Sequence, residues 1–502
     1  MQMDIKKGKL NIRVSLAFKI MTMLAAIATR MCLVASCGND VNGLNALYIS
    51  VIGFLSVAEL GIGTAITFCM YQPIVEGATE RVAALYHLFR KLYLLIGSII
   101  FVGGLAVLPF LKYLAKDYRA LDVNMYLTFF LMLLSVVLTY LFSAKLSLIN
   151  AYKNNYISTA ITQGGMLLQY VLQIIVLLIT QSFAAFLLCR IIALLPQWLI
   201  TEVVTRKKHG DVIAIHARPD AEIQKAVKKN VAAMFMHKIG DILVNTADSV
   251  IISIFVGVAA LGEYANYTLV LSSMLSVLAL VFTPLTSVLG HLYAEESKKT
   301  VQAYADSLHL LNFMLGAVFF LGYYAVIDHL IALLFPSAPL LLRSISFVIT
   351  LNGFVQFLRH STLIFRDATG TFYHDRWKPL AEGLLNVILS VLFVKLFGVV
   401  GVIAATAVTN LLICHTVEPY VLYKHAFSAS PSRYYIKNFG MILAFAITLT
   451  GMHFCLRSTS HAITALLVNG LISLGFSSVL CILVLACNRQ DGKRLLKIFR
   501  EG

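Results

Sequence analysis

The stretch KIGDILVNTADSVIISIFVG, residues 238–257, has the length and apolar content of a membrane-spanning helix, yet it contains charges. Lys238, Asp241 and Asp248 lie in it, and Asn245 lies between the two acids. At about 100° per residue, intervals of four and three place Asp241, Asn245 and Asp248 on one stripe of a helix. Each charge in mid-bilayer costs about 2.5 to 3.5 kcal/mol on insertion scales, so this stripe is expected to face protein or water.

The rest of the chain shares this apolar character. Of its 502 residues 59% are hydrophobic and 13% are charged, and its mean hydropathy is +0.84. This composition excludes an ordinary water-soluble domain and predicts an integral membrane protein. Apolar runs of about 20 residues recur along the chain without the alternation of a β-barrel, so the prediction is an all-α, polytopic membrane protein.

Charged breaks and Pro- or Gly-rich breaks divide the chain into about fourteen expected spans. They start near Val14, Asn42, Arg81, Val123, Tyr156, Phe183, Lys228, Gly262, Tyr304, Leu340, Pro379, Val399, Tyr434 and Ile463. Most of the 40 Lys and Arg then fall on the side that holds both termini, which predicts cytoplasmic termini by the positive-inside rule. Because this rule also accounts for most of the net charge of +16, no nucleic-acid partner is expected.

The longest hydrophilic stretch divides the spans into two expected lobes. Residues 205–227 are predicted to form a cytoplasmic linker loop between an N-terminal lobe, 1–204, with spans one to six, and a C-terminal lobe, 228–427, with spans seven to twelve. Residues 428–502 are predicted to add a terminal helix pair and a basic tail.

A short repeat supports this division. GLNALY, residues 43–48, and GEYANY, residues 262–267, share Gly, Ala and Tyr at one register, and they open the second and eighth expected spans. Parallel repeats related by an axis along the membrane normal are typical of transporters that bind their substrate between two lobes.

Several kinds of chemistry have no support in the sequence. No GxxxxGK[ST] stretch is present, so the chain is not expected to hydrolyse ATP by itself. The eight cysteines form no CxxC and no His/Cys ligand spacing, so no metal or other cofactor is expected. The largest outward loop, about 110–122, is too small for a catalytic domain, so no enzyme activity is expected. A membrane glycosyltransferase or polymerase stays as an alternative.

Four cations in or at the ends of expected spans are candidate substrate-binding residues: Arg30, Lys238, Arg190 and Arg359. A guanidinium group suits bidentate capture of phosphate oxygens, so these residues favour an amphiphile with an anionic head. The alternative for each is a structural role, either an ion pair with a buried acid or, for Lys238, a side chain that reaches the membrane surface.

Three acids are candidate ion-coupling residues: Asp241, Asp248 and Glu59. A buried carboxyl group holds its proton more readily than an exposed one, so protonation can couple substrate movement to a proton gradient. The alternative is again structural pairing with basic neighbours. Tyr48, Tyr71, Tyr264 and Tyr267 lie near span ends, where they are candidates for stacking on sugars or for anchoring at the interface.

Longer strings resemble a known family. They are NALYISVIGFLSVAELGIGTAITFCMYQPI (45–74), DSVIISIFVGVAALGEYANY (248–267), FRDATGTFYHDRWKPLAEGLLNVILSVLFVKLFGVVGVIAATAVTNLL (365–412) and VEPYVLYKHAF (417–427). The chain resembles the Wzx-type oligosaccharide flippases of the multidrug/oligosaccharidyl-lipid/polysaccharide (MOP) exporter superfamily. The resemblance extends over nearly the whole chain.

This resemblance implies a fold and a function. The implied fold has twelve to fourteen helices in two lobes around a central cavity, as in the multidrug exporters called MATE. The implied function is to move undecaprenyl-diphosphate-linked oligosaccharide units of O-antigen, capsule or exopolysaccharide across the bacterial cytoplasmic (inner) membrane. Lipid-linked oligosaccharide and membrane lipid are the implied partners, together with a polysaccharide polymerase and glycosyltransferases. A multidrug exporter and a peptidoglycan-precursor flippase of the same superfamily are the alternatives.

Overall fold

The computed structural model describes residues 2–59, 62–217, 219, 242, 244, 246–282, 285–371, 374–457 and 461–501. Within these residues the chain is helical and has no strand. The expected all-α class is therefore confirmed. The chain divides into two compact units, Met1–Gly262 and Glu263–Gly502. The expected lobe boundaries at residues 204 and 228 remain a prediction.

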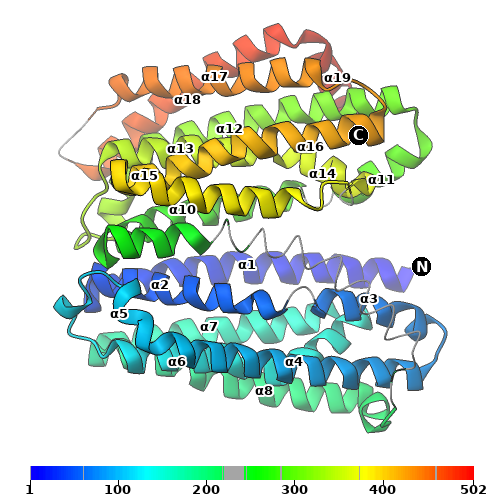
Figure 1. Cartoon of the computed structure of the whole chain (residues 1–502). Coiled ribbons are helices and arrows are strands. Elements are labelled where there is room, and N and C mark those ends of the chain that lie inside the picture. The colour runs from blue at the N-terminus through cyan, green and yellow to red at the C-terminus, as the bar shows by residue number, and fades with distance from the viewer. Residues whose placement is uncertain are drawn as a thin grey trace. The chain divides into compact units, whose positions relative to one another are not determined.

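The first unit is a bundle of long helices. It contains α1 (Gln2–Cys37), α2 (Asn39–Leu55), α3 (Ile62–Val75), α4 (Thr79–Val107), α5 (Leu111–Leu114), α6 (Met125–Ala151), α7 (Asn155–Thr180), α8 (Phe183–Ala214) and the short apolar helix Thr246–Phe255. Within it α1 packs on α7, α7 on α8, α8 on α6 and α6 on α4. The long helices of this unit run side by side (Figure 1).

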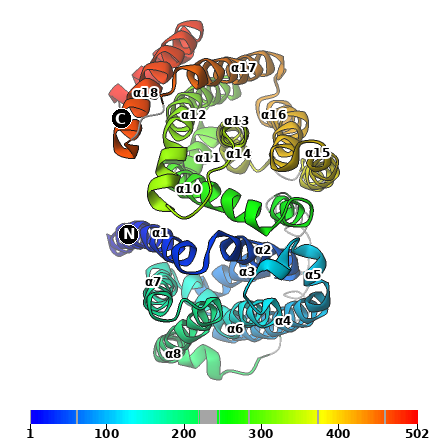
Figure 2. The same ribbon diagram turned by 90° about the vertical axis from the view of Figure 1, so that its left-hand side faces the viewer.

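The second unit is also a helical bundle. It contains most of α10 (Val258–Phe282), α11 (Leu285–Glu295), α12 (Lys298–Leu334), α13 (Arg343–Leu358), α14 (His360–Thr369), α15 (Lys378–Thr409), α16 (His415–Leu422), α17 (Ser432–Cys455), α18 (Ala462–Cys487) and α19 (Arg489–Glu501). Helix α12 packs against α13 and α18, and α13 packs against α15. Figure 2 views this bundle from a direction in which α12 has α13, α17 and α18 around it.

Nine helical runs among the described residues are long and apolar enough to cross a membrane. One of them, Lys378–Phe427, is 50 residues long, and Gly398 interrupts it with φ 58° and ψ −135°. A positive φ is accessible to glycine at no steric cost, so Gly398 separates the spans that we expect to start near Pro379 and Val399. Many apolar spans in one helical chain indicate a multi-pass membrane protein.

Local residue chemistry sets several helix ends. The side chains of Asn124, Ser182 and Ser297 accept hydrogen bonds from the third residue beyond them at the starts of α6, α8 and α12. Such N-caps satisfy amide groups that have no partner inside a helix. Helix α14 ends at Thr369, and the glycine that follows it, Gly370, has a φ of 70°.

The second expected span differs from the prediction because it is broken. Helix α2 ends at Leu55, a 3₁₀ turn covers Ser56–Glu59, and α3 begins at Ile62. The Ser56 hydroxyl donates a hydrogen bond to the carbonyl of Ile52, 2.9 Å away, and bonds of this kind bend helices. The break places Glu59 at a helix end inside the bundle.

The repeated Gly positions lie at a close approach within the first unit. A Cβ on Gly43 would overlap the carbonyl oxygen of Val258, and a Cβ on Gly262 would overlap the backbone of Asn39. The Asn39 amide donates to the carbonyl of Ala259 over 3.1 Å. Glycine is thus required where α2 meets the first turn of α10.

The repeated Tyr positions are fully buried. The Tyr48 hydroxyl donates to the carbonyl of Met125 over 2.8 Å, and the Tyr267 hydroxyl donates to the Asp328 carboxylate over 2.8 Å. Neither ring is placed to anchor at a membrane surface or to stack on a sugar. The sequence-based interpretation of these two tyrosines was wrong because it used only their position near span ends.

Candidate functional site

Two of the expected site residues, Lys238 and Asp241, lie outside the described residues. Their roles stay predictions. Asp248 lies in the helix Thr246–Phe255 and is 8% exposed, so this acid is buried within the first unit. Its ion-coupling role also stays a prediction.

A cationic site in the first unit contains two of the predicted substrate-binding residues. Arg30 lies on α1 and Arg190 lies on α8, and both interact electrostatically with Tyr170 on α7. This arrangement follows from the packing of α7 between α1 and α8. The structure therefore brings together two arginines that are far apart in the sequence. We call Arg30, Tyr170 and Arg190 the arginine site.

The contacts of Arg190 show how this side chain is held. Its Nη1 atom lies 3.2 Å from the sulfur of Met132, and Tyr170 is its electrostatic partner. Neither Met nor neutral Tyr carries a negative charge that could neutralise a guanidinium. Among the described residues, Arg190 thus has no carboxylate partner. An uncompensated cation in a membrane-spanning bundle favours an anionic ligand.

Glu59 lies at a second polar position in the first unit. The Tyr93 hydroxyl donates to Glu59 Oε1 over 2.9 Å, and the Tyr140 hydroxyl donates to Oε2 over 3.3 Å. The tyrosines come from α4 and α6, and their ring centroids are 5.5 Å apart. One carboxylate thus takes two hydroxyl donors at the break between α2 and α3. We call these three residues the Glu59 site.

The third predicted cation that the structure describes, Arg359, lies in the second unit and has carboxylate partners. Its Nη2 and Nε atoms donate to the two carboxylate oxygens of Glu418 over 2.6 and 3.1 Å. Its Nη1 atom lies 3.5 Å from Glu382 and also donates to Asn410. Lys378 Nζ lies 2.6 Å from Glu418 and 2.8 Å from Glu382. The two positive charges of this cluster are therefore matched by two negative charges.

This cluster of Arg359, Lys378, Glu382 and Glu418 we call the ion quartet. Glu418 is 1% exposed and Glu382 is 6% exposed, so both acids are deep in the second unit. Bidentate pairing gives Arg359 a fixed geometry. The quartet favours the structural alternative for Arg359, and the substrate-binding role of this residue stays a prediction.

Sequence reasoning missed the tyrosines at both sites of the first unit. Tyr170 lies in a span that also contains Gln169 and Gln173, and these polar neighbours are a weak signal. Tyr93 and Tyr140 have no local signal, because their role depends on how α4 and α6 pack on the turn at Glu59.

Metal binding has no support in the described part of the chain. No group of three or more His, Cys, Asp and Glu is arranged there to hold a metal ion.

The fold of the chain is similar to that of several solved transporters. The lipid II flippase MurJ, in an inward closed conformation, superposes with a TM-score of 0.63 at 14% identity, over 94% of this chain and 98% of that chain. An inward-facing multidrug resistance MATE transporter of the MOP superfamily superposes with a TM-score of 0.62 at 14% identity, over 82% of this chain and 98% of that chain. The chain has the fold of these membrane transporters.

A third similar structure is a MOP superfamily transporter from Pyrococcus furiosus, with a TM-score of 0.52 at 13% identity over 84% of this chain and 97% of that chain. Its description states that the reverse polarity of its binding pocket suggests a different function. No protein-family model and no curated protein sequence matches the chain. At these identities the similarity establishes the fold, which agrees with the one that the sequence resemblance implies.

Proposed function

We propose that the chain is a flippase that moves oligosaccharide units linked to undecaprenyl diphosphate across the bacterial cytoplasmic membrane by alternating access. Both termini are cytoplasmic in this proposal, and the lobes are residues 1–204 and 228–427, joined by the loop 205–227. The product supplies O-antigen, capsule or exopolysaccharide synthesis. The partners are the lipid-linked oligosaccharide, membrane lipid, a polysaccharide polymerase and glycosyltransferases.

The arginine site is the observation that carries this proposal. A diphosphate linked to a sugar cannot cross hydrocarbon unaided, because its charges lose their hydration. Arg30 and Arg190 supply two guanidinium groups inside a membrane-spanning bundle, and each is suited to bidentate contact with phosphate oxygens. In the proposed mechanism these groups hold the diphosphate while the polyprenyl chain stays in lipid. Lys238 and Arg359 are further proposed contacts.

Ion coupling is assigned to three acids. The Glu59 carboxylate accepts hydrogen bonds from the Tyr93 and Tyr140 hydroxyls over 2.9 and 3.3 Å. Asp241 and Asp248 are the other two proposed coupling residues. Proton binding at these positions is proposed to drive the return of the empty transporter.

Two alternatives of the same fold differ in the ligand. MurJ is described as a lipid II flippase, so a peptidoglycan-precursor flippase is the second candidate, and it also needs cations for a diphosphate. A multidrug exporter for cationic drugs needs acids and few cations in its site. The arginine site argues against the multidrug alternative. A membrane glycosyltransferase or polymerase is the least supported alternative.

The test uses purified full-length protein in liposomes that contain a lipid-diphosphate-linked oligosaccharide. A membrane-impermeant glycosidase added outside measures how fast inward-facing oligosaccharide appears at the outer surface. We expect the protein to accelerate this appearance, and Arg190→Gln to slow it at least tenfold. A cationic dye and lipid II are tested in parallel.

Each outcome selects one candidate. Transport of the oligosaccharide lipid supports the proposal. Transport of lipid II alone selects the peptidoglycan-precursor alternative, and accumulation of the dye alone selects the multidrug exporter. Formation of a new glycosidic bond by the purified protein selects the enzyme alternative.

A further inference from the structure

The last helix, α19, has one buried face and one basic face. Five of its 13 residues are Lys or Arg, and two are acidic. Asp491 and Leu495 are buried, whereas Arg489 and Lys493 are exposed. At about 100° per residue, Arg489 and Lys493 lie nearly opposite Asp491 and Leu495 on the helix, and the spacing of four continues in the sequence at Lys497. We call Arg489, Lys493 and Lys497 the basic stripe.

An ion pair and apolar packing fix the buried face of α19. Lys437 of α17 lies 2.8 Å from the Asp491 carboxylate and also donates to the Asp306 carbonyl of α12 over 3.2 Å. Asp491 is 6% exposed, and Leu495 belongs to the hydrophobic core of the second unit. Helix α19 packs against α12 and α18, and Figure 1 shows it close to α17 as well. These contacts leave Arg489 on the outer side of the helix.

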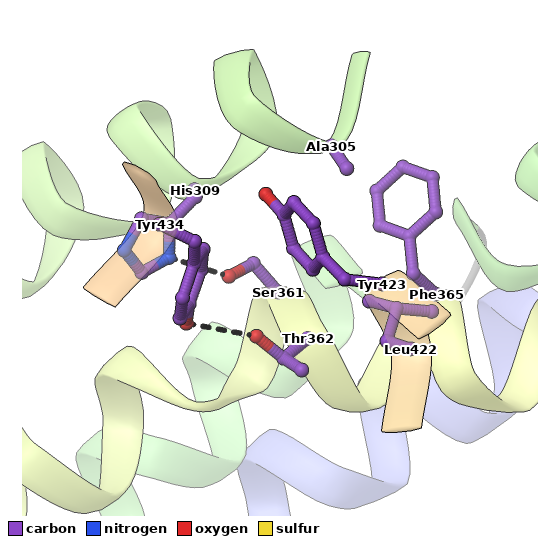
Figure 3. A pocket seen from close by; sticks show the side chains of 8 residues that line it. All are labelled: Ala305, His309, Ser361, Thr362, Phe365, Leu422, Tyr423 and Tyr434. Carbon is purple, nitrogen blue, oxygen red and sulfur yellow. Dashed lines mark hydrogen bonds between the residues drawn. The ribbon is translucent and has the colours of Figure 1, made fainter. Parts of the chain in front are cut away.

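The start of α17, which holds α19, is itself tied to the bundle. The Tyr434 hydroxyl lies 3.0 Å from the Thr362 hydroxyl of α14, and Figure 3 shows these two side chains pointing toward each other. The Tyr423 hydroxyl donates to the Asp306 carboxylate over 2.8 Å. A ligand that binds α19 from outside therefore acts on a helix that is linked to α12, α14 and α17, so its binding should stabilise the second unit.

The position of α19 in the chain places the basic stripe at the membrane surface. Helix α18 has 26 residues and is thus about 40 Å long, which exceeds a hydrocarbon thickness of about 30 Å. Arg489 follows Cys487, the last residue of α18, by two positions. Ile482 and Leu483, near that end of α18, are 66% and 59% exposed, as expected for side chains that contact lipid. The headgroup layer is therefore the nearest surroundings of the stripe.

We propose that the basic stripe of α19 binds the phosphate groups of anionic membrane lipids and that this binding stabilises the second unit. Anionic headgroups complement the cations, and each basic residue near an anionic membrane surface strengthens binding about fivefold. In an isolated interfacial helix the apolar face enters the lipid. In α19 the protein covers that face, so the cations remain for the headgroups. The proposal does not depend on the identity of the transported substrate.

An acidic soluble protein is the competing ligand for a basic surface. The exposed apolar side chains Ile482 and Leu483 lie within about two turns of Arg489 and favour lipid over such a protein. The basic stripe also follows a membrane-spanning helix directly, so lipid headgroups are present there at high local concentration. The experiment therefore compares lipid with soluble anions.

The test uses the purified full-length protein in a neutral detergent, with phosphatidylglycerol or phosphatidylcholine added in increasing amounts. The thermal midpoint is measured at each lipid concentration. We expect phosphatidylglycerol to raise the midpoint by at least about 5 °C more than phosphatidylcholine does. About 1 M NaCl should remove most of this difference, because it screens exposed charges. Arg489→Gln combined with Lys493→Gln should raise the phosphatidylglycerol concentration for half of the effect at least about tenfold.

The matched control is Lys207→Gln combined with Lys208→Gln, which removes two exposed cations from α8 in the first unit. We expect this variant to respond to phosphatidylglycerol like the unchanged protein. If the α19 double variant does not fold, Lys493→Gln and its control Lys207→Gln replace the pair, with an expected change of about fivefold. Inorganic phosphate and a soluble acidic peptide are added in parallel.

The outcomes separate lipid from the other ligands. A response that is specific for phosphatidylglycerol and weakened by the α19 substitutions supports the proposal. Equal effects of the two lipids, equal responses of the two double variants, or the same rise in midpoint with inorganic phosphate or the acidic peptide overturns it.

Discussion

The two units treat their buried cations in opposite ways. In the first unit, Arg190 has a thioether and a tyrosine as its described partners. In the second unit, Arg359 has two carboxylates within 3.5 Å and shares them with Lys378. Both arginines occur in apolar sequence, so their residue type alone does not separate them. Their partners do, and the difference favours a ligand-binding role for Arg190 and a structural role for Arg359, both of which stay predictions.

Electrostatics explains why the partners of a buried arginine determine whether it can attract an anionic ligand. A buried ion pair offsets the cost of desolvation only when its geometry is good and its remaining hydrogen bonds are satisfied. The ion quartet meets this condition, because Arg359 and Lys378 share Glu418 at 2.6 Å each. A cation without a carboxylate keeps its attraction for an anion that arrives later.

The largest expected effect comes from removing one carboxylate of the ion quartet. After Glu418→Gln, Glu382 is the one carboxylate of the ion quartet that remains for Arg359 and Lys378. Breaking a buried ion pair in this way lowers the free energy of unfolding by about 3 to 5 kcal/mol. We expect a much lower thermal midpoint and yield of the detergent-purified protein, measured by fluorescence-detected size exclusion after heating.

A matched control and a rescue make this prediction specific to the quartet. Glu76→Gln makes the same change at an exposed residue that accepts one bond from Gln72, and it is expected to leave the midpoint unchanged. Adding Lys378→Met to Glu418→Gln restores the charge balance and should recover part of the loss, because the two residues are in contact. Equal midpoints for Glu418→Gln and Glu76→Gln would remove the distinction between the units.

The second prediction concerns the arginine site. Arg190→Gln is expected to reduce transport of the lipid-linked diphosphate at least tenfold, since a hydrogen bond to a charged group contributes about 1.5 to 3 kcal/mol. The thermal midpoint should hardly change, because the described partners of Arg190 include no carboxylate that the substitution would leave unpaired. Transport is measured with the liposome assay described above.

The control for this prediction lies on the same helix. Arg206 is on α8, its side chain is 73% exposed, and it pairs with Glu202. Arg206→Gln should change neither transport nor stability beyond about 0.5 kcal/mol. A strong loss of stability with Arg190→Gln would show that Arg190, like Arg359, belongs to the fold.

Composition and apolar periodicity were enough to predict the helical membrane fold. They could not locate the break in the second expected span, because the bend at Ser56 depends on a side-chain bond to the Ile52 carbonyl. The repeat of Gly43 and Gly262 was visible in the sequence, but the sequence did not show why both positions need glycine. A close approach joins helices far apart in the chain, and it becomes apparent only from the backbone atoms that a Cβ would overlap.

The candidate site was predictable only in part. The sequence singled out Arg30, Arg190 and Arg359 as equivalent candidates, because each is a cation in or at the end of an apolar run. Packing brings the first two together around Tyr170 and surrounds the third with acids. The partners of each arginine come from helices that are distant in the sequence. The apolar periodicity of a single helix therefore cannot predict them.

The third prediction tests whether the Glu59 site senses protons. Glu59→Gln keeps the shape and one acceptor oxygen for the tyrosines but removes the titratable group. We expect the transport rate to lose its dependence on an imposed pH gradient, while transport without a gradient changes less than threefold. The measurement compares liposomes with and without the gradient for Glu59→Gln, Asp248→Asn and Asp241→Asn.

The outcome again separates alternatives. If none of the three substitutions alters the response to the gradient, proton coupling through these acids is wrong, and Glu59 is a structural acceptor for two tyrosines. If Glu59→Gln alone alters it, the coupling function belongs to the helix break in the first unit.

The smallest expected effects come from the two hydroxyl donors to Glu59. Tyr93→Phe removes a bond of 2.9 Å and is expected to destabilise the protein by about 1.5 kcal/mol, whereas Tyr140→Phe removes a bond of 3.3 Å and is expected to cost less than about 1 kcal/mol. In the Glu59→Gln background both costs should shrink, because the acceptor is then neutral. Thermal midpoints of the three single variants and the two double variants measure this coupling.

A tyrosine of the second unit provides the matched comparison. The Tyr267 hydroxyl donates to the Asp328 carboxylate over 2.8 Å, so Tyr267→Phe removes a bond similar to that of Tyr93. Asp328 also accepts a bond from Ser346 over 3.0 Å, which parallels the second donor to Glu59. If Tyr93→Phe and Tyr267→Phe destabilise the protein equally but only Tyr93→Phe changes the response to a pH gradient, the two units are alike in how they satisfy a half-buried carboxylate. The functional difference between them then lies in the helix break at Glu59, since local hydrogen bonding would be the same in both.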